Sequence, residues 1–470
     1  MTSRAAAKMR PEGGSYRDRS NRVFYQDQDV LRALDDQALA NWRRLRETRF
    51  YGDFLARGQI VPTEELDRLP SLLPSGNPWA AVLSHARIPF VSYPYEWSFG
   101  MLKAAALLHL DLMAAALEES MILKDSSAYN VQWMGSRPVF IDIPSFEVLQ
   151  EGEPWIGYRQ FCMLFLYPLM LQAYRGAPFQ PWLRGAIDGI EPADMAHLLG
   201  WSDCWRGGVL SHVKLQAKLQ QQKSLQDQDL RASLKKSGFS SALIKANVAG
   251  LKKLVGKLNW KAAGSTWSHY ATNHSYSAQE HGEKLDFVRA VAMQRSWSLA
   301  WDLGGNTGDF SRILAENTES VVLVDGDSLA VERAFRTFQA EGETRILPLY
   351  MDLSDPSPDR GWRGRERGSL LQRGQPELVL ALALVHHLVI GANVPLSDFV
   401  DWLADLGCAV VVEFVTRDDD MVKQLMRNRE DQFSDYELHH FEELLHQRFR
   451  LIDQKPLKGG QRVIYHLEPA

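Results

Sequence analysis

The chain has 470 residues, of which 45% are hydrophobic and 24% are charged. This length and composition are typical of a soluble globular protein with two or three domains. The net charge of −5 provides no basic field for nucleic acid, so we expect no nucleic-acid partner. Three scattered cysteines argue against a disulfide framework and a thiolate zinc site. The N-terminus lacks the apolar stretch of a secretory signal, and we expect a cytoplasmic protein.

Composition divides the chain into four parts. We predict a disordered tail over 1–15, an α+β domain rich in aromatic residues over 16–205, a helical linker rich in Gln and Lys over 206–262, and an α/β domain over 263–470. In the last part, short apolar strands alternate with amphipathic helices. This alternation favours a sheet of mostly parallel strands.

Helical periods extend over 99–118 and 158–173 in the second part. After the first of these helices, Asp125 precedes Asn130 by five residues, and Asp142 ends the next apolar run. This spacing resembles the catalytic loop and the metal-binding Asp of protein kinases and aminoglycoside phosphotransferases. The resemblance implies a kinase-like cleft in which Asp125 is the base and Asn130 and Asp142 are magnesium ligands.

Important parts of the kinase pattern are missing from this sequence. Leu123 stands where the family has His, Ile-Pro follows the second Asp in place of Phe-Gly, and no Gly-rich loop precedes these residues. The usual lysine is also absent, so Arg17 or Arg32 would have to replace it. We therefore predict a degenerate kinase-like domain that serves as a substrate-presenting or scaffold module. The alternative is an active phosphotransferase.

The segment 243–258 combines an apolar stripe with several lysines. Apolar residues recur at spacings of four and three, and the lysines occupy other faces, so we predict an amphipathic helix. Its apolar face would either pack against a neighbouring domain or contact an anionic membrane or partner.

Five short apolar segments in the last part are predicted strands: 298–303, 320–324, 345–350, 377–384 and 408–412. A glycine-rich loop, Gly304-Gly305-Asn306-Thr307-Gly308, follows the first of them. Such glycines let the backbone turn sharply into a helix and approach a ligand closely. Asp325 ends the second strand and Asp352 follows the third. These groups share the sheet edge where open α/β folds bind ligands.

The loop reads D-x-G-x-N-x-G, and the chain ends in a predicted hairpin of 449–454 and 462–467. Together these features resemble the class I S-adenosylmethionine (SAM)-dependent methyltransferase family over about 265–470. The resemblance implies a Rossmann-like sheet of seven strands, with SAM as the cofactor. It assigns the methionine part of SAM to four residues: Asp302, Gly304, Asn306 and Gly308.

The same resemblance gives Asp325 the ribose and Asp352 the adenine amino group. Asn306 stands where many family members have Gly. Aromatic residues before the first strand, Tyr276 among them, would cap the SAM pocket or pack the linker onto the sheet.

Methyl transfer needs alignment of the reactants and removal of a proton. His386 or His387, after the fourth strand, is the candidate base, and Glu413 follows the next strand. Either histidine could instead be structural. Glu413 could hold a divalent metal together with Asp418, but carboxylates after a strand often cap the next turn, and we predict no metal site.

Five arginines cluster between 360 and 373. Arginine forks suit a carboxylate or a phosphate. The alternative is a solvated helix face with Glu366 as a partner.

Three N-terminal segments, SYPYEWSF, LKDSSAYNVQW and FIDIPSFE, resemble a bacterial family of SAM-dependent methyltransferases, some of whose members are related to nodulation proteins. We therefore expect a methyltransferase that acts on a small molecule or glycan. The alternatives are a bifunctional kinase–methyltransferase and a non-catalytic protein that binds SAM or a partner.

Overall fold

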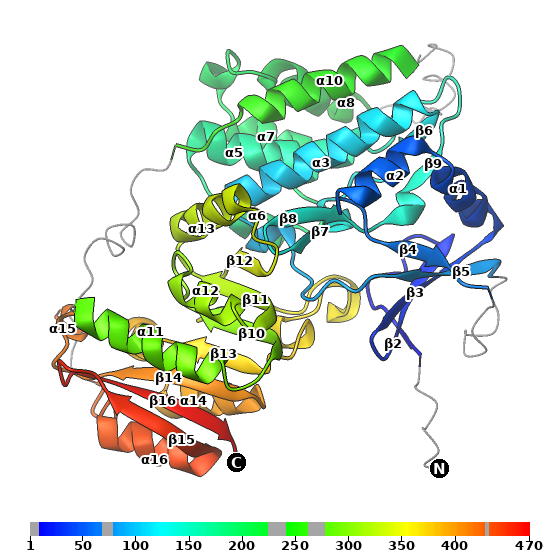
Figure 1. The fold of residues 1–470 in the computed structure, drawn as a ribbon. Coiled ribbons are helices and arrows are strands. Elements are labelled where there is room, and N and C mark those ends of the chain that lie inside the picture. Colours follow the sequence, from blue (N-terminus) through cyan, green and yellow to red (C-terminus); the bar gives the residue numbers. More distant parts are fainter. Residues whose placement is uncertain (1–8, 68–78, 224–240, 262–277, 428–431) are drawn as a thin grey trace.

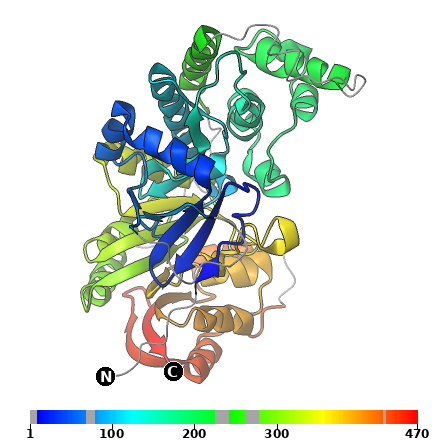
Figure 2. The ribbon, with the colours of Figure 1, turned by 90° about the vertical axis from the view of Figure 1, so that its right-hand side faces the viewer.

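The computed structural model of the chain describes residues 9–67, 79–223, 241–261, 278–427 and 432–470. The described residues up to 261 form an N-terminal half, in which a small sheet is joined to a group of helices. Those from 278 onward form a C-terminal half around a larger sheet (Figures 1 and 2).

The N-terminal sheet has five antiparallel strands in the order β1-β2-β3-β5-β4. The strands are β1 (Arg10–Pro11), β2 (Asn21–Gln26), β3 (Asp29–Leu34), β4 (Thr63–Glu65) and β5 (Ala81–His85). Helices α1 (Asp36–Arg46) and α2 (Arg49–Ala56) connect β3 to β4. Asp35 caps α1 by accepting a hydrogen bond from the Ala38 N–H at 2.8 Å, which satisfies one of the free donors at the helix start.

We predicted a disordered tail over 1–15. This prediction is wrong for residues 9–15, which the structure describes. Strand β1 pairs with β2, and the Glu12 N–H donates to the Val23 carbonyl oxygen at 2.9 Å. These residues therefore belong to the sheet and to the loop that connects its first two strands.

A long helix, α3 (Phe99–Glu118), is the core of the N-terminal half. Ser98 caps it, as its side chain accepts from the Met101 N–H. By length and composition α3 could cross a membrane, but most of its apolar side chains are buried within this half. It is therefore a core helix by the contacts it makes.

Short strands and turns follow α3. These are β6 (Met121–Leu123), the 3₁₀ turn η2 (Ala128–Asn130), β7 (Val131–Met134), β8 (Arg137–Phe140), η3 (Ile143–Ser145) and β9 (Phe146–Val148). Strands β7 and β8 form a hairpin, and β6 pairs with β9. The turn η1 (Pro94–Glu96) precedes α3.

The rest of the N-terminal half is helical. Its elements are α4 (Tyr158–Phe161), the π-turn η4 (Cys162–Leu166), α5 (Tyr167–Arg175), α6 (Gln180–Gly185), α7 (Pro192–Leu198), η5 (Trp201–Asp203), η6 (Val209–Lys214), α8 (Leu215–Lys223) and α10 (Ser241–Lys257). Elements α4, η4 and α5 run on without a break, in agreement with the helix predicted over 158–173.

Helix α10 confirms the amphipathic helix predicted over 243–258. Four apolar residues of one face, Ile244, Val248, Leu251 and Val255, are buried, and the helix packs against α3. Lys245 and Lys252 pair with Glu118 and Asp111 of α3. The described part of the predicted linker is therefore helical, but it packs as part of the N-terminal half, and the apolar face of α10 is already covered.

The C-terminal sheet has seven strands in the order β12-β11-β10-β13-β14-β16-β15. The strands are β10 (Trp297–Leu303), β11 (Thr318–Asp325), β12 (Ile346–Tyr350), β13 (Leu378–Ala381), β14 (Ala409–Val415), β15 (Phe449–Pro456) and β16 (Arg462–Pro469). The first five are parallel, whereas β16 is antiparallel to both of its neighbours. The parallel strands are buried almost throughout, which explains their continuous apolar sequences.

Helices cover both faces of this sheet (Figure 1). They are α11 (Ala278–Ala292), α12 (Asp309–Ala315), α13 (Ser328–Glu341), α14 (Leu396–Asp405), α15 (Asp420–Met426) and α16 (Leu438–Arg448), with short turns η7 (Trp362–Gly364) and η8 (Leu370–Gln372) and the π-turn η9 (His387–Gly391). The arginine cluster, for which the sequence left open a site for a carboxylate or phosphate and a solvated helix face, lies on the loop that contains η7 and η8.

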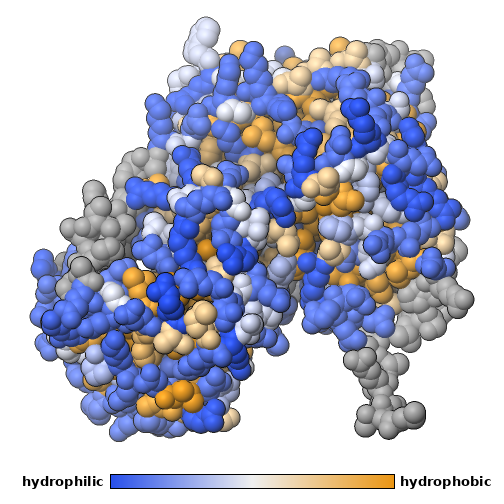
Figure 3. All heavy atoms as spheres, in the orientation of Figure 1, coloured by the Kyte–Doolittle hydropathy of each residue, from blue (hydrophilic) through white to orange (hydrophobic). Residues whose placement is uncertain are grey.

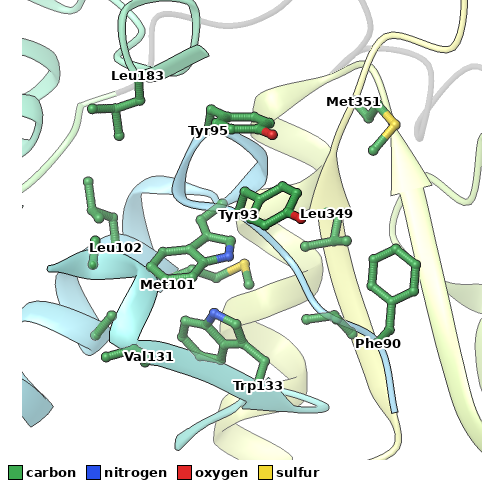
Figure 4. Packing of buried hydrophobic residues seen from close by; sticks show 14 of the residues in the cluster. Phe90, Tyr93, Tyr95, Met101, Leu102, Val131, Trp133, Leu183, Leu349 and Met351 are labelled. Atoms are coloured by element: carbon green, nitrogen blue, oxygen red, sulfur yellow. The ribbon is translucent and has the colours of Figure 1, made fainter. Parts of the chain in front are cut away.

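The two halves share one hydrophobic core. Tyr93 of the N-terminal half lies beside Leu349 of the C-terminal half (Figure 4), and the ring of Trp133 lies 5.5 Å from that of Phe335 between centroids. A buried ion pair also joins the halves, because Arg373 Nη2 lies 2.5 Å from Glu96 Oε1. Elsewhere the visible surface is mostly hydrophilic, with small hydrophobic patches (Figure 3).

Candidate functional site

The glycine-rich loop connects β10 to α12 and needs its glycines for conformation. Gly304 and Gly308 have φ angles of +78° and +93°, a region that side chains disfavour. A Cβ atom on Gly308 would lie 2.5 Å from the Phe338 ring. Beside Gly304 the nearest atom to such a Cβ is 3.7 Å away, on Leu384, which is an ordinary van der Waals contact, so Gly304 is needed for its backbone conformation rather than for space. Asn306, with a φ of +49°, is a residue type that tolerates this region.

Asp302 is buried beneath this loop. Its Oδ2 accepts a hydrogen bond from Ser311 Oγ at 2.6 Å, which ties the end of β10 to α12. Burial raises the pKa of Asp302 to about 6. We conclude that Asp302 supports the loop from within.

Asp325 is the last residue of β11, and its side chain connects the end of that strand to the glycine-rich loop that follows β10. Its two carboxylate oxygens accept from the Asn306 N–H at 2.8 Å and the Asp327 N–H at 2.7 Å. Burial raises the pKa of Asp325 to about 6, although both backbone hydrogen bonds oppose that rise. A carboxylate has about four acceptor positions, so two of them remain for a ligand.

Asp352 lies at the same edge of the sheet. The Met351 N–H donates to the Asp325 carbonyl oxygen at 2.9 Å, so the ends of β11 and β12 adjoin. The Asp352 side chain is exposed, and its Oδ1 accepts from Ser354 N–H and Oγ at 2.9 and 2.7 Å. The structure therefore brings together the loop, Asp325 and Asp352, as predicted from the sequence. Tyr276 lies outside the described residues.

The two histidines follow β13, which ends at Ala381, whereas we predicted a strand to Leu384. Their rings are 4.1 Å apart between centroids. His386 is fully buried, and burial holds its pKa well below the usual value. His387 is half-buried, and burial, with a smaller effect of the Arg462 charge, lowers its pKa to about 4. Both rings are therefore neutral near pH 7, and His387 is the more accessible of the two.

Glu413 belongs to a buried charge network at the end of β14. Its oxygens lie 2.7 Å from Lys284 Nζ and 3.2 Å from Arg462 Nη1, and its Oε2 accepts from the Ala383 N–H at 2.8 Å. Arg462 also pairs with Asp419 at 2.7 Å. Because all these charges are buried, the geometry favours a positioning role for Glu413 over that of a base. It holds α11, β16 and the loop that leads to the histidines.

Sequence reasoning missed Lys284, Arg462 and Asp419 as partners in this network. A signal was present, because Arg462 directly precedes the apolar residues Val463, Ile464 and Tyr465, and its charge needs a buried partner there.

A cavity of about 650 Å³ lies in the N-terminal half and is lined by Asp125, Asn130 and Asp142, which the kinase-like spacing had singled out. Asp142 Oδ1 lies 2.5 Å from Arg32 Nη1, and its other oxygen accepts from Ser145 Oγ. Burial, and then the charge of Asp142, raises the pKa of Asp125.

Arg32 and Gly14 also line this cleft. Arg17 and Arg32 were considered as replacements for the missing lysine. Of these two, Arg32, which is on β3, pairs with Asp142. Gly14 lines the cavity from the loop between β1 and β2, a loop that the sequence analysis placed in a tail. Across the described residues, no group of three His, Cys, Asp or Glu side chains is placed to hold a metal ion.

The order of the seven strands, the antiparallel last strand and the glycine loop with an acid after the second strand are the arrangement of the class I methyltransferase fold. No family model matches the chain. It is 36% identical over 474 residues to the nodulation protein NoeA of Rhizobium meliloti (strain 1021), an alignment that covers 98% of this chain and 97% of that protein. The chain belongs to the family of nodulation protein NoeA.

Two solved structures are also similar in part. The N-methyltransferase NodS from Bradyrhizobium japonicum WM9 aligns with a TM-score of 0.31 and 11% identity, over 41% of this chain and 98% of NodS. The PH0226 protein from Pyrococcus horikoshii OT3 aligns with a TM-score of 0.31 and 14% identity, over 44% of this chain and all of that protein (100%).

Proposed function

We propose that the chain is a SAM-dependent methyltransferase that acts in the cytoplasm on a small molecule or glycan. The observation that carries this proposal is the meeting of the glycine loop, Asp325 and Asp352 at one sheet edge. The backbone of Gly304 to Gly308 would hold the methionine part, Asp325 the ribose hydroxyls and Asp352 the adenine amino group. The two free acceptor positions of Asp325 fit two adjacent hydroxyls.

Bound SAM supplies an activated methyl group on a sulfonium sulfur. The protein's main task is then to align the acceptor in line with that methyl and to exclude water. A neutral His387, with a pKa of about 4, is a weak base but a good hydrogen-bond partner, so it would orient the acceptor. Glu413 would hold the loop that carries His387 through the Ala383 N–H.

Calorimetry with S-adenosylhomocysteine, the demethylated form of SAM, tests this assignment. We expect binding to the full chain and a loss of about 1.5–3 kcal/mol, or about tenfold to a hundredfold in affinity, in Asp325→Ala. The exposed Asp398 on α14 provides the control, and Asp398→Ala should bind as the unchanged protein does. Unchanged affinity in Asp325→Ala would sink the assignment. Binding without transfer to any acceptor would favour a non-catalytic SAM-binding protein.

We further propose that the N-terminal half has a kinase-like fold that does not transfer phosphate. The strand order β1-β2-β3-β5-β4, the helices after β3 and the hairpin between Asn130 and Asp142 support the kinase-like fold. The Arg32–Asp142 pair supports the loss of phosphotransfer, because a guanidinium stands where magnesium would bind.

The bifunctional kinase–methyltransferase remains the second candidate, favoured by the meeting of Asp125, Asn130 and Asp142 around one cavity. ATP hydrolysis that depends on magnesium and is abolished by Asp142→Ala would move it to first place. The similarity to NoeA is the basis on which we propose a role in nodulation.

A further inference from the structure

The cavity in the N-terminal half is completed by the C-terminal half. Glu366 and Arg367, on the loop after β12, line it together with the kinase-like residues. The Glu366 side chain is fully buried and accepts from Arg17 Nε at 2.5 Å, Arg17 Nη2 at 3.1 Å and Tyr16 Oη at 3.0 Å. One wall of the cleft thus comes from the loop that begins at Asp352.

The contact between the loop that follows β1 and the loop that follows β12 is closely packed. A Cβ atom on Gly13 would lie 2.1 Å from the Arg365 carbonyl oxygen, and one on Gly14 would lie 2.7 Å from that of Glu366. The Arg367 guanidinium lies 4.2 Å from the centroid of the Tyr129 ring. The cleft therefore has its full shape only when both halves are present.

The charges that line the cleft are largely paired with one another. The carboxylates are Glu12, Asp18, Asp125, Asp142, Asp188, Glu191 and Glu366, and the cations are Arg17, Arg32, Lys124, Arg159 and Arg367. All five cations are in ion pairs with lining carboxylates: Arg17–Glu366, Arg32–Asp142, Lys124–Asp18, Arg159–Glu191 and, at the longer distance of 3.9 Å, Arg367–Glu366. Carboxylates outnumber cations in the lining, so a polyphosphate would meet net repulsion there.

We infer that this cleft binds a neutral polyhydroxylated ligand, a sugar or short oligosaccharide, between the two halves. Hydroxyl groups both donate and accept, so they can bond to Asp125 and Asp188 as donors and to Arg367 as acceptors without adding charge. Asn130 and Gln160 add amide donors and acceptors. The volume of about 650 Å³ is in the range of small-molecule sites. This inference rests on the proposed absence of phosphotransfer and is independent of SAM binding.

Titration of the full chain with neutral mono-, di- and trisaccharides tests the inference. We expect saturable binding of at least one of them, with slower hydrogen exchange at 124–130 and 365–367. Asp125→Asn, a change that keeps the side-chain shape, should lower the affinity about tenfold or more. Asp194→Asn, at an exposed position on α7 outside the cavity lining, should leave it unchanged.

Two results would overturn the inference. One is the absence of binding and of exchange protection with every saccharide at millimolar concentrations, which needs no variant. The other is binding of ATP that requires magnesium and displaces the saccharide. Titration of the same sample with S-adenosylhomocysteine keeps a failure of this inference distinct from a failure of the proposed methyltransferase function.

Discussion

At the strand ends of the C-terminal sheet, Asp325 accepts two hydrogen bonds from backbone N–H groups, whereas in the N-terminal cleft Asp142 is paired with the guanidinium of Arg32. Backbone donors orient a carboxylate without neutralising it, so its charge remains for a ligand. A guanidinium both orients and neutralises its partner. The first region is therefore prepared for an added ligand at Asp325, and the second has lost the free charge that a metal ion would need.

The largest expected effect concerns the buried network behind the first region. Replacement of Glu413 by Ala removes the buried carboxylate that pairs with Lys284 and Arg462, and should lower the free energy of unfolding by about 3–5 kcal/mol. Urea unfolding measures this change. The matched control is Glu316→Ala, which removes an exposed pair with Arg289 and should change stability far less. Equal effects would show that the network is not structural.

The pH dependence of cofactor binding tests the free charge of Asp325. Because the pKa of Asp325 is raised to about 6, its carboxylate is ionised at pH 7 and becomes protonated as the pH falls. We expect SAM affinity to fall up to about tenfold per pH unit below pH 6. Asp325→Asn should bind more weakly, without this dependence. The same slope in both proteins would contradict the role given to Asp325.

The free energy of unfolding should also depend on the protonation of Asp325, but in the opposite direction to SAM affinity. The folded chain keeps a proton on Asp325 between about pH 4 and pH 6, where the unfolded chain has released it. The Asp325 contribution to the free energy of unfolding therefore falls as the pH rises through this window. A comparison of wild type with Asp325→Asn by urea unfolding at pH 4 and pH 7 measures it.

The smallest expected effect concerns the N-terminal cleft. Replacement of Arg32 by Ala removes the ion-pair partner of Asp142 but supplies neither a lysine nor a Gly-rich loop for the phosphates of ATP. We expect no magnesium-dependent ATP hydrolysis in wild type or in Arg32→Ala. Turnover that appears only in the variant would show that the Arg32–Asp142 pair is an inhibitory contact in an otherwise competent site.

The sequence predicted the C-terminal sheet well because its parallel strands are buried on both faces and read as apolar runs. The site residues followed from their places at the strand ends. The end of β13 was misplaced, because the residues after Ala381 are apolar yet pack within a turn. Burial also lowers the pKa of His387 to about 4, which no local pattern could show.

Long-range contacts explain what the sequence could not predict. The segment around Gly13 is rich in small and polar residues, a composition typical of a disordered tail. Its ordered structure depends on contacts with Arg365 and Glu366. In the same way, the buried pair of Arg373 with Glu96 joins residues far apart in the chain. A solvated helix face was therefore one of the two interpretations of the arginine cluster, although Arg367 and Arg373 lie between the two halves.

Thermal unfolding of the full chain with S-adenosylhomocysteine and with magnesium ATP, each alone and both together, tests the central comparison most directly. We predict that S-adenosylhomocysteine raises the Tm and that magnesium ATP leaves it unchanged, with or without the first ligand. A rise in Tm with magnesium ATP alone, and none with S-adenosylhomocysteine, would contradict the account of both regions.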